Sequence, residues 1–199
     1  MFIQIIQARC NRQDDCRAML DRWLDELAPG ADGWLGGTYG FTDDGQLVAV
    51  VRFESREAAM ANSERPEQGR WWAEMEKTLD GPAEFHESDD VTVMMDGGSD
   101  SAGFVQVMRG KVDDPSKLKA MMTDTSMLHE MRPEIIGATL VLEDDGTFIE
   151  TVAFTSEDDA RRSESTTAMP EEMRRDWDSM MHDVTYLDLH QPWFSSARR

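Results

Sequence analysis

The sequence is poor in cysteine, in basic residues and in long apolar runs, and each shortage narrows what the protein can be. Its 199 residues include two cysteines, 20 Lys and Arg, and 40 Asp and Glu, so the formal net charge is -20. Such a surface repels nucleic-acid backbones and anionic membranes, so we expect neither as a partner. No apolar run approaches the roughly 18 residues of a membrane-spanning helix, and the N-terminus lacks the basic segment of a signal peptide.

The two cysteines, Cys10 and Cys16, do not form a metal-ligand quartet and have no counterparts in the second half of the chain. Cys16 falls on the apolar stripe of the first expected helix, where it would be a small buried hydrophobe. The simplest interpretation is a reduced chain in the cytoplasm. His86, His182 and His190 lack partners at metal-ligand spacing, and the chain has no phosphate-binding loop, so we expect no metal and no cofactor.

What the sequence does contain is a single unit that occurs twice, in the same order, with an offset near one hundred residues. Two copies predict a pseudo-symmetric pair of domains of roughly a hundred residues each. The clearest matches are Phe2-Ile3-Gln4 with Phe104-Val105-Gln106, Ala18-Met19 with Ala120-Met121, Asp43-Asp44-Gly45 with Asp144-Asp145-Gly146, Phe53-Glu54-Ser55 with Phe154-Thr155-Ser156, and Arg70-Trp71-Trp72 with Arg175-Asp176-Trp177.

Each copy shows the same succession of local signals. An apolar strand, residues 2–9 or 104–111, precedes an amphipathic helix and then a hairpin with Asp-Asp-Gly at its turn. Ser55 and Ser156 stand where the N-cap of a second helix belongs, and Pro66 and Pro170 predict a break in that helix. A last strand is expected over residues 91–94 in the first copy and 184–187 in the second.

This order, β-α-β-β-α-β, is the ferredoxin-like arrangement, and it places the chain in the α+β class. We expect a first repeat over residues 1–95, a linker over 96–103, a second repeat over 104–191 and a tail over 192–199. One such unit leaves a sheet face uncovered, so the two repeats can bury both faces as an intramolecular dimeric α+β barrel, or join their edges. The protein would then be a monomeric pseudo-dimer or a homodimer.

Two short segments carry a resemblance to a known family. Residues 53–58, Phe-Glu-Ser-Arg-Glu-Ala, are similar to the aromatic-Glu-Ser-x-Glu-Ala step from third strand to second helix in the antibiotic-biosynthesis-monooxygenase-like branch of the dimeric α+β-barrel superfamily. Residues 33–36, Gly-Trp-Leu-Gly, resemble the Gly-aromatic-x-Gly start of its second strand, although the second copy keeps only Gly137. The chain thus resembles a tandem duplication of that unit.

Members of the branch include cofactor-independent oxygenases of polycyclic phenols and haem-degrading enzymes, and many relatives have no known activity. The haem-degrading members resemble each other through a tryptophan and a ligating histidine on the second helix. Asn62 and Trp71 fall near those two positions in the first copy, so we expect no haem.

Four candidate ligand-binding residues occupy matching places in the two copies. Gln4 and Gln106 lie on the first strands, where a polar side chain can face a ligand pocket or form a structural hydrogen bond to a neighbouring strand. Trp72 and Trp177 lie on the later part of the second helix, where each can form the aromatic wall of a pocket or anchor the core.

A fifth candidate, His129, comes from a difference between the copies. At a constant offset, apolar residues of the first helix are replaced by polar ones in the second copy, which would mark a pocket there. A shift of one residue would instead expose His129 and align Leu128 with Leu27. The replaced positions are Trp23, Leu24 and Leu27 against Thr125, Ser126 and His129.

These observations predict a small-molecule-binding α+β-barrel protein of undetermined activity, whose ligand would be a small apolar or aromatic molecule. The alternative is a cofactor-independent monooxygenase acting on an aromatic or polycyclic compound, with no catalytic residue assigned. Such chemistry needs a dry pocket and a few polar groups, because the substrate itself supplies electrons to oxygen. An enclosed cavity touching Gln106, His129 and Trp177 would favour the oxygenase.

Overall fold

The computed structural model describes residues 1–95, 97–123, 130–166, 175, 177 and 179–197. The chain forms two compact units, Met1–Asp89 with Trp193–Arg199, and Asp90–Pro192. Each unit contains a five-stranded sheet whose neighbouring strands are antiparallel. No helix in the described ranges is long and apolar enough to cross a membrane.

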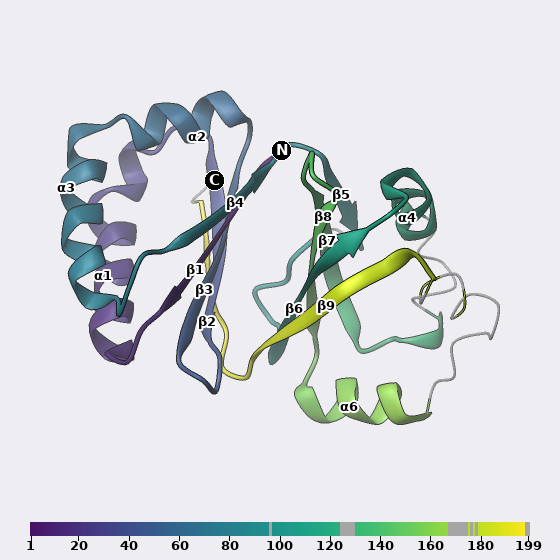
Figure 1. Ribbon diagram of the computed structural model, residues 1–199. Helices are drawn as coiled ribbons and strands as arrows, with labels where there is room; N and C mark the ends of the chain where they lie inside the picture. The colour runs from purple at the N-terminus through teal and green to yellow at the C-terminus, as the bar shows by residue number, and fades with distance from the viewer. Residues whose placement is uncertain (96, 124–129, 167–174, 176, 178, 198–199) are drawn as a thin grey trace. The chain divides into compact units, whose positions relative to one another are not determined.

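In the first unit three helices cover one face of the sheet (Figure 1). The strand order is β10-β2-β3-β1-β4. The elements are β1 (Phe2–Arg9), α1 (Gln13–Glu26), β2 (Trp34–Phe41), β3 (Gln46–Phe53), α2 (Arg56–Ser63), α3 (Pro66–Met75), β4 (Glu84–Ser88) and β10 (Trp193–Ser196), with short 3-10 turns at Ala28–Gly30 and Glu76–Thr78.

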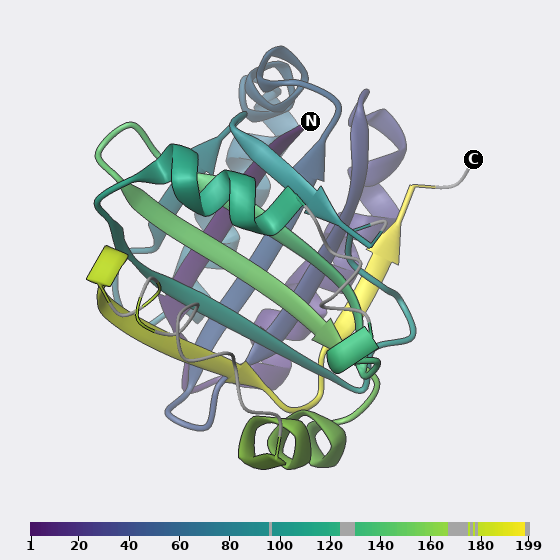
Figure 2. The same ribbon diagram turned by 90° about the vertical axis from the view of Figure 1, so that its right-hand side faces the viewer.

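The second unit repeats this plan with the order β5-β7-β8-β6-β9. Figure 2 shows α4 lying across a face of this sheet. The elements are β5 (Val91–Met94), β6 (Phe104–Val112), α4 (Pro115–Thr123), β7 (Ile135–Leu142), β8 (Thr147–Phe154), α6 (Glu157–Thr166) and β9 (Met181–Leu189).

The turns and helix starts that the sequence predicted are confirmed in both units. Gly45 and Gly146 have φ values of 81° and 80°, the left-handed conformation that glycine adopts without a Cβ clash. Ser55 Oγ and Ser156 Oγ each accept a hydrogen bond at 3.2 Å from the backbone N–H three residues later. These side chains satisfy N–H groups that have no partner within the helix.

The helix break predicted at Pro66 is also confirmed, because α2 ends at Ser63 and α3 begins at Pro66. Proline in the first turn loses nothing, since its missing N–H would have had no partner in the helix. The matching prediction at Pro170 lies outside the described residues.

The sheet edges differ from the expected arrangement. Val91–Met94 is a strand, but it pairs with β7 of the second unit, and β4 takes the place beside β1. The sequence of β4, Glu-Phe-His-Glu-Ser, lacks an apolar run because an edge strand needs only one hydrogen-bonded neighbour and keeps part of its surface in solvent. Trp193–Ser196, expected in a tail, forms β10 along β2, as Figure 2 shows.

The cysteines also differ from expectation. Cys16 is fully buried in the core, as predicted, but it forms a disulfide with Cys10 rather than a free thiol. Because β1 ends at Arg9 and α1 begins at Gln13, the connecting turn brings Cys10 back against the first turn of the helix. The prediction of a reduced pair was therefore wrong for this structure.

Candidate functional site

A pocket of about 70 Å³ lies in the first unit, between the sheet and the helices that cover it. Its sheet side includes Ala8 of β1 and Ala49 of β3, whose small side chains leave the space open. Its helix side includes Leu20 of α1 and Met75 of α3. Exposed Ser63 and half-buried Trp72 also line it, so the pocket reaches the surface beside α2 and α3.

Three tryptophans line the pocket on the helix side. Trp23 and Trp71 line the pocket with ring centroids 6.5 Å apart, and the centroid of Trp72 lies 6.0 Å from that of Trp71. Trp72 also packs against Phe85 of β4 at 5.3 Å. Such offset and edge-on ring contacts hold the aromatic wall in place.

None of the described residues lining the pocket carries a charge at neutral pH, and its polar groups, apart from the tryptophan N–H groups, are amides and hydroxyls. They belong to Gln4, Tyr39, Asn62, Ser63 and Gln68. Burial raises the pKa of Tyr39, so its hydroxyl stays protonated and can donate a hydrogen bond. The pocket therefore suits a neutral ligand with few polar atoms.

Of the five residues proposed from the sequence, Gln4 and Trp72 lie together at this pocket. Gln106 instead donates to Asp188 Oδ1 of the neighbouring strand at 2.8 Å, and Gln4 donates in the same way to Glu87. The structural hydrogen bond that we considered for this position is therefore present in both units.

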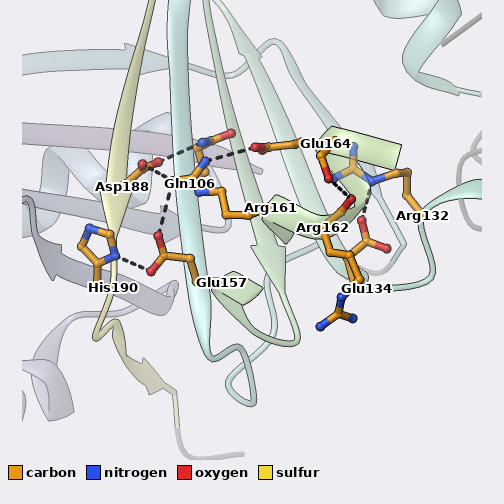
Figure 3. A network of polar contacts seen from close by, with 10 residues as sticks. Gln106, Arg132, Glu134, Glu157, Arg161, Arg162, Glu164, Asp188 and His190 are labelled. Carbon is orange, nitrogen blue, oxygen red and sulfur yellow. Dashed lines mark hydrogen bonds and ion pairs between the residues drawn. The ribbon is translucent and has the colours of Figure 1, made fainter. Parts of the chain in front are cut away.

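Gln106 belongs to a polar network on the second sheet and α6 (Figure 3). Asp188 also binds Arg161, whose guanidinium lies 3.5 Å from Glu157 Oε1 and 5.2 Å from the ring centroid of Phe104. Glu157 Oε2 in turn lies 2.6 Å from His190 Nδ1. These mutually paired charges connect α6 with β6 and β9, so the network has an evident structural role.

Of the other two proposed residues, the structure describes only Trp177. Trp177 is half-buried and packs against the apolar cluster around Phe148 and Met180, as a core anchor would. His129 lies outside the described residues. We expected the second repeat to hold the pocket, but the pocket described above lies in the first.

Sequence reasoning missed Glu150, a buried carboxyl on β8. Its side chain is 7% exposed, and it stands opposite Met108 on one side and Leu140 on the other. Burial among these apolar neighbours raises its pKa to about 7. Glu150 takes the place that Ala49 occupies in the first unit, and a glutamate within the run Phe148-Ile149-Glu150 was the signal for it.

Titratable side chains do not gather into a metal centre in the part of the chain described. No group of three or more His, Cys, Asp or Glu residues is placed there to hold a metal ion. The arrangement of the first unit is therefore an apolar pocket with neutral hydrogen-bonding groups, carried by a repeated α+β unit.

No family model matches the sequence, and no curated protein matches it. Solved structures match nearly the whole chain. A candidate monooxygenase from Lactobacillus acidophilus NCFM is 11% identical, with a TM-score of 0.72 over 99% of this chain and 97% of that one. Another candidate monooxygenase, from Fusobacterium nucleatum, is 9% identical, with a TM-score of 0.76 over 98% and 94%. An anthrone oxidase-like protein is 10% identical, with a TM-score of 0.65 over 100% and 94%.

At such low identities these likenesses concern the fold. They confirm the predicted α+β fold, and each matching chain is covered by 94% or more. The fold alone assigns no chemistry, so the function has to be argued from the pocket.

Proposed function

We propose that the protein binds a small, neutral, aromatic or apolar molecule in the pocket of the first unit. The observation that carries this proposal is the lining, in which three tryptophans and small sheet residues enclose a space with no charged side chain. Ligand sites are typically apolar concavities with a few convergent polar groups, as here.

The size of the pocket limits how a ligand sits. A cavity of roughly 150 Å³ is enough for benzene, so about 70 Å³ takes only part of a ring system. The remainder of a bicyclic or polycyclic ligand would extend past Trp72, whose half-buried ring would rotate outward. Ligand binding should therefore change the environment of this tryptophan.

Binding of indane, a neutral two-ring hydrocarbon, tests the proposal. Ala49→Phe fills the pocket from the sheet side and should abolish binding measured by calorimetry or tryptophan fluorescence, with Ala49→Val intermediate. Ala73→Phe, at an exposed position of α3 that does not line the pocket, is the matched control and should bind like the wild type. Unchanged affinity in a folded Ala49→Phe variant would refute the assigned site.

A second candidate function is cofactor-independent oxygenation, which the protonated Tyr39 hydroxyl and the pocket amides favour because such groups can stabilise a developing oxyanion. One of the similar structures is an anthrone oxidase-like protein. The balanced reaction of that class converts an anthrone and O₂ into an anthraquinone and water. Oxygen uptake with anthrone that is lost in Ala49→Phe would support it, and uptake equal to the uncatalysed rate would exclude it for this substrate.

The cytoplasmic location stays a prediction, and the Cys10–Cys16 bond argues against it because disulfides persist in oxidising compartments. Since one chain supplies both repeats, we propose a monomeric pseudo-dimer, which light scattering would distinguish from a homodimer. The net charge of -20 supports the prediction that nucleic acids and anionic membranes are not partners.

A further inference from the structure

We propose that the pocket selects ligands that carry a carbonyl oxygen, because two amide side chains on its helix side keep N–H₂ groups that have no acceptor among the described residues. This inference rests on the proposed function, since the pocket must first bind a small molecule. The two amides belong to Asn62 of α2 and Gln68 of α3, and both residues line the pocket.

A donor bound to each amide oxygen fixes the orientation of the amide. Arg65 Nη1 donates to Asn62 Oδ1 at 2.9 Å, and Trp23 Nε1 donates to Gln68 Oε1 at 2.6 Å. In an amide side chain only the oxygen accepts a hydrogen bond from an N–H group. The atom facing each donor is therefore the oxygen, and the N–H₂ group of each amide points away from that donor. Neither N–H₂ group donates to an acceptor within the described ranges, which leaves both available to a ligand.

The two fixing residues are themselves held in place. Arg65 Nη1 also donates to the carbonyl of Leu27 at 3.1 Å, and its Nε lies 3.0 Å from Glu67 Oε1. Trp23 is buried, and its ring packs edge-on against Trp34 with centroids 5.3 Å apart. Donors held in this way require little reorganisation when a ligand oxygen arrives, which increases their contribution to binding.

The sheet side of the pocket offers an acceptor as well as the Tyr39 hydroxyl. Gln4 Nε2 donates to Glu87, so Gln4 Oε1 is left as an acceptor. A ligand with a ketone towards the helices and a hydroxyl towards the sheet would match both sides. A carboxylate or ammonium ligand would lose its hydration without meeting an opposite charge, so the pocket disfavours both.

The second unit does not repeat this donor pair. Ser163 stands at the place of Asn62, seven residues after the N-cap serine in both copies. A serine hydroxyl can either donate or accept, so it does not impose the same preference. The selectivity for a carbonyl is therefore expected of the first unit.

The test compares 1-indanone with indane, which have the same two-ring shape and differ by a ketone in place of a methylene. We expect the wild type to bind 1-indanone about tenfold more tightly, since each neutral hydrogen bond contributes modestly. Gln68→Glu and Asn62→Asp keep an acceptor for Trp23 and Arg65 but replace the free N–H₂ with oxygen. Both should lose the preference, whereas Gln13→Glu, an exposed change on α1, should keep it.

The ratio of the two affinities is the deciding quantity, and thermal unfolding verifies that each variant is folded. If the wild type binds both compounds equally, or if the two pocket variants keep the preference, this inference is overturned while the proposed function stands. If the wild type binds neither compound, the proposed function itself fails and the inference with it.

Discussion

We expect Glu150→Gln to stabilise the protein at neutral and alkaline pH and to have little effect in acid. Glu150 is 7% exposed, and its neighbours across the sheet, Met108 and Leu140, are both buried and apolar. The ionised form therefore loses its hydration on folding, and burial raises the pKa from 4.5 to about 7. Glutamine is close in shape to the protonated acid and does not titrate.

The sign and magnitude follow from the two pKa values. Because the folded state holds the proton more tightly, the wild type has no penalty below about pH 4.5, loses stability as the pH rises towards 7, and carries the full penalty above it. The difference between 4.5 and about 7 corresponds to about 3 kcal/mol. About 2 kcal/mol of this should develop between pH 5.5 and pH 8.

The groups near Glu150 do not offset this effect. Tyr186 stands opposite Met108 on β9, and its own pKa is raised by burial first and then by the carboxylates of Glu164 and Glu150. Arg161 of α6 is already paired with Glu157, Glu164 and Asp188. Its charge is therefore largely compensated.

Urea unfolding followed by circular dichroism at pH 5.5 and pH 8 measures the effect, and both values lie above the sequence pI of about 4.4, where solubility would be lowest. Asp144→Asn removes a carboxylate from the exposed turn of the same hairpin and is the matched control. A difference between Glu150→Gln and wild type that is the same at both pH values, or that shrinks towards pH 8, would contradict the assignment.

Two further predictions concern backbone packing and the disulfide. Gly137→Ala places a Cβ 1.6 Å from the carbonyl oxygen of Gly97, so β7 must shift at a cost of about 3 kcal/mol in unfolding free energy. Gly69→Ala, at an exposed position of α3, meets nothing within 4 Å and should raise stability by about 1 kcal/mol; equal melting temperatures for the two variants would be inconsistent with this packing. Dithiothreitol should lower the unfolding free energy by about 2 kcal/mol through the Cys10–Cys16 bond, and a Cys10→Ser/Cys16→Ser variant should be insensitive to it; an equal response of both proteins would disprove the role of the bond.

The features that could be predicted from the sequence are those encoded in a few neighbouring residues. The glycine turns at Gly45 and Gly146 and the serine caps at Ser55 and Ser156 need only local geometry, so one pattern predicts each of them. Their recurrence at a fixed offset then predicts the repeated α+β unit. The similar structures confirm this fold although their sequences are only 9–11% identical.

The features that could not be predicted depend on which distant segment becomes a neighbour. The pattern of β4 is polar because β4 lies at an edge, and the pairing of Val91–Met94 with β7 is decided by tertiary contacts. The position of the pocket was inferred from the first helix of each copy, where a polar residue of the second copy aligns with Trp23. The structure shows that the sheet matters as much, since Ala49 leaves room where Glu150 does not.

One contact that changes its chemistry between the copies helps to separate structural from functional positions. Arg56 and Asp89 form an ion pair at 3.3 Å in the first unit, and the guanidinium lies 4.8 Å from the ring centroid of Phe2. At the same positions of the second unit, Glu157 pairs with His190 at 2.6 Å, with the acid and the base exchanged.

In the second unit the basic partner again lies against the phenylalanine of the first strand, because the rings of His190 and Phe104 have centroids 5.8 Å apart. A contact that keeps its place while the acid and the base are exchanged serves to join the second helix to the last strand, which either arrangement achieves. A change in side-chain volume, in contrast, cannot be balanced by exchanging two partners. The second unit has Glu150 at the position that Ala49 occupies in the first, which changes the space and the charge on the helix-facing side of the sheet. The two units should therefore bind different ligands, or only the first should bind one.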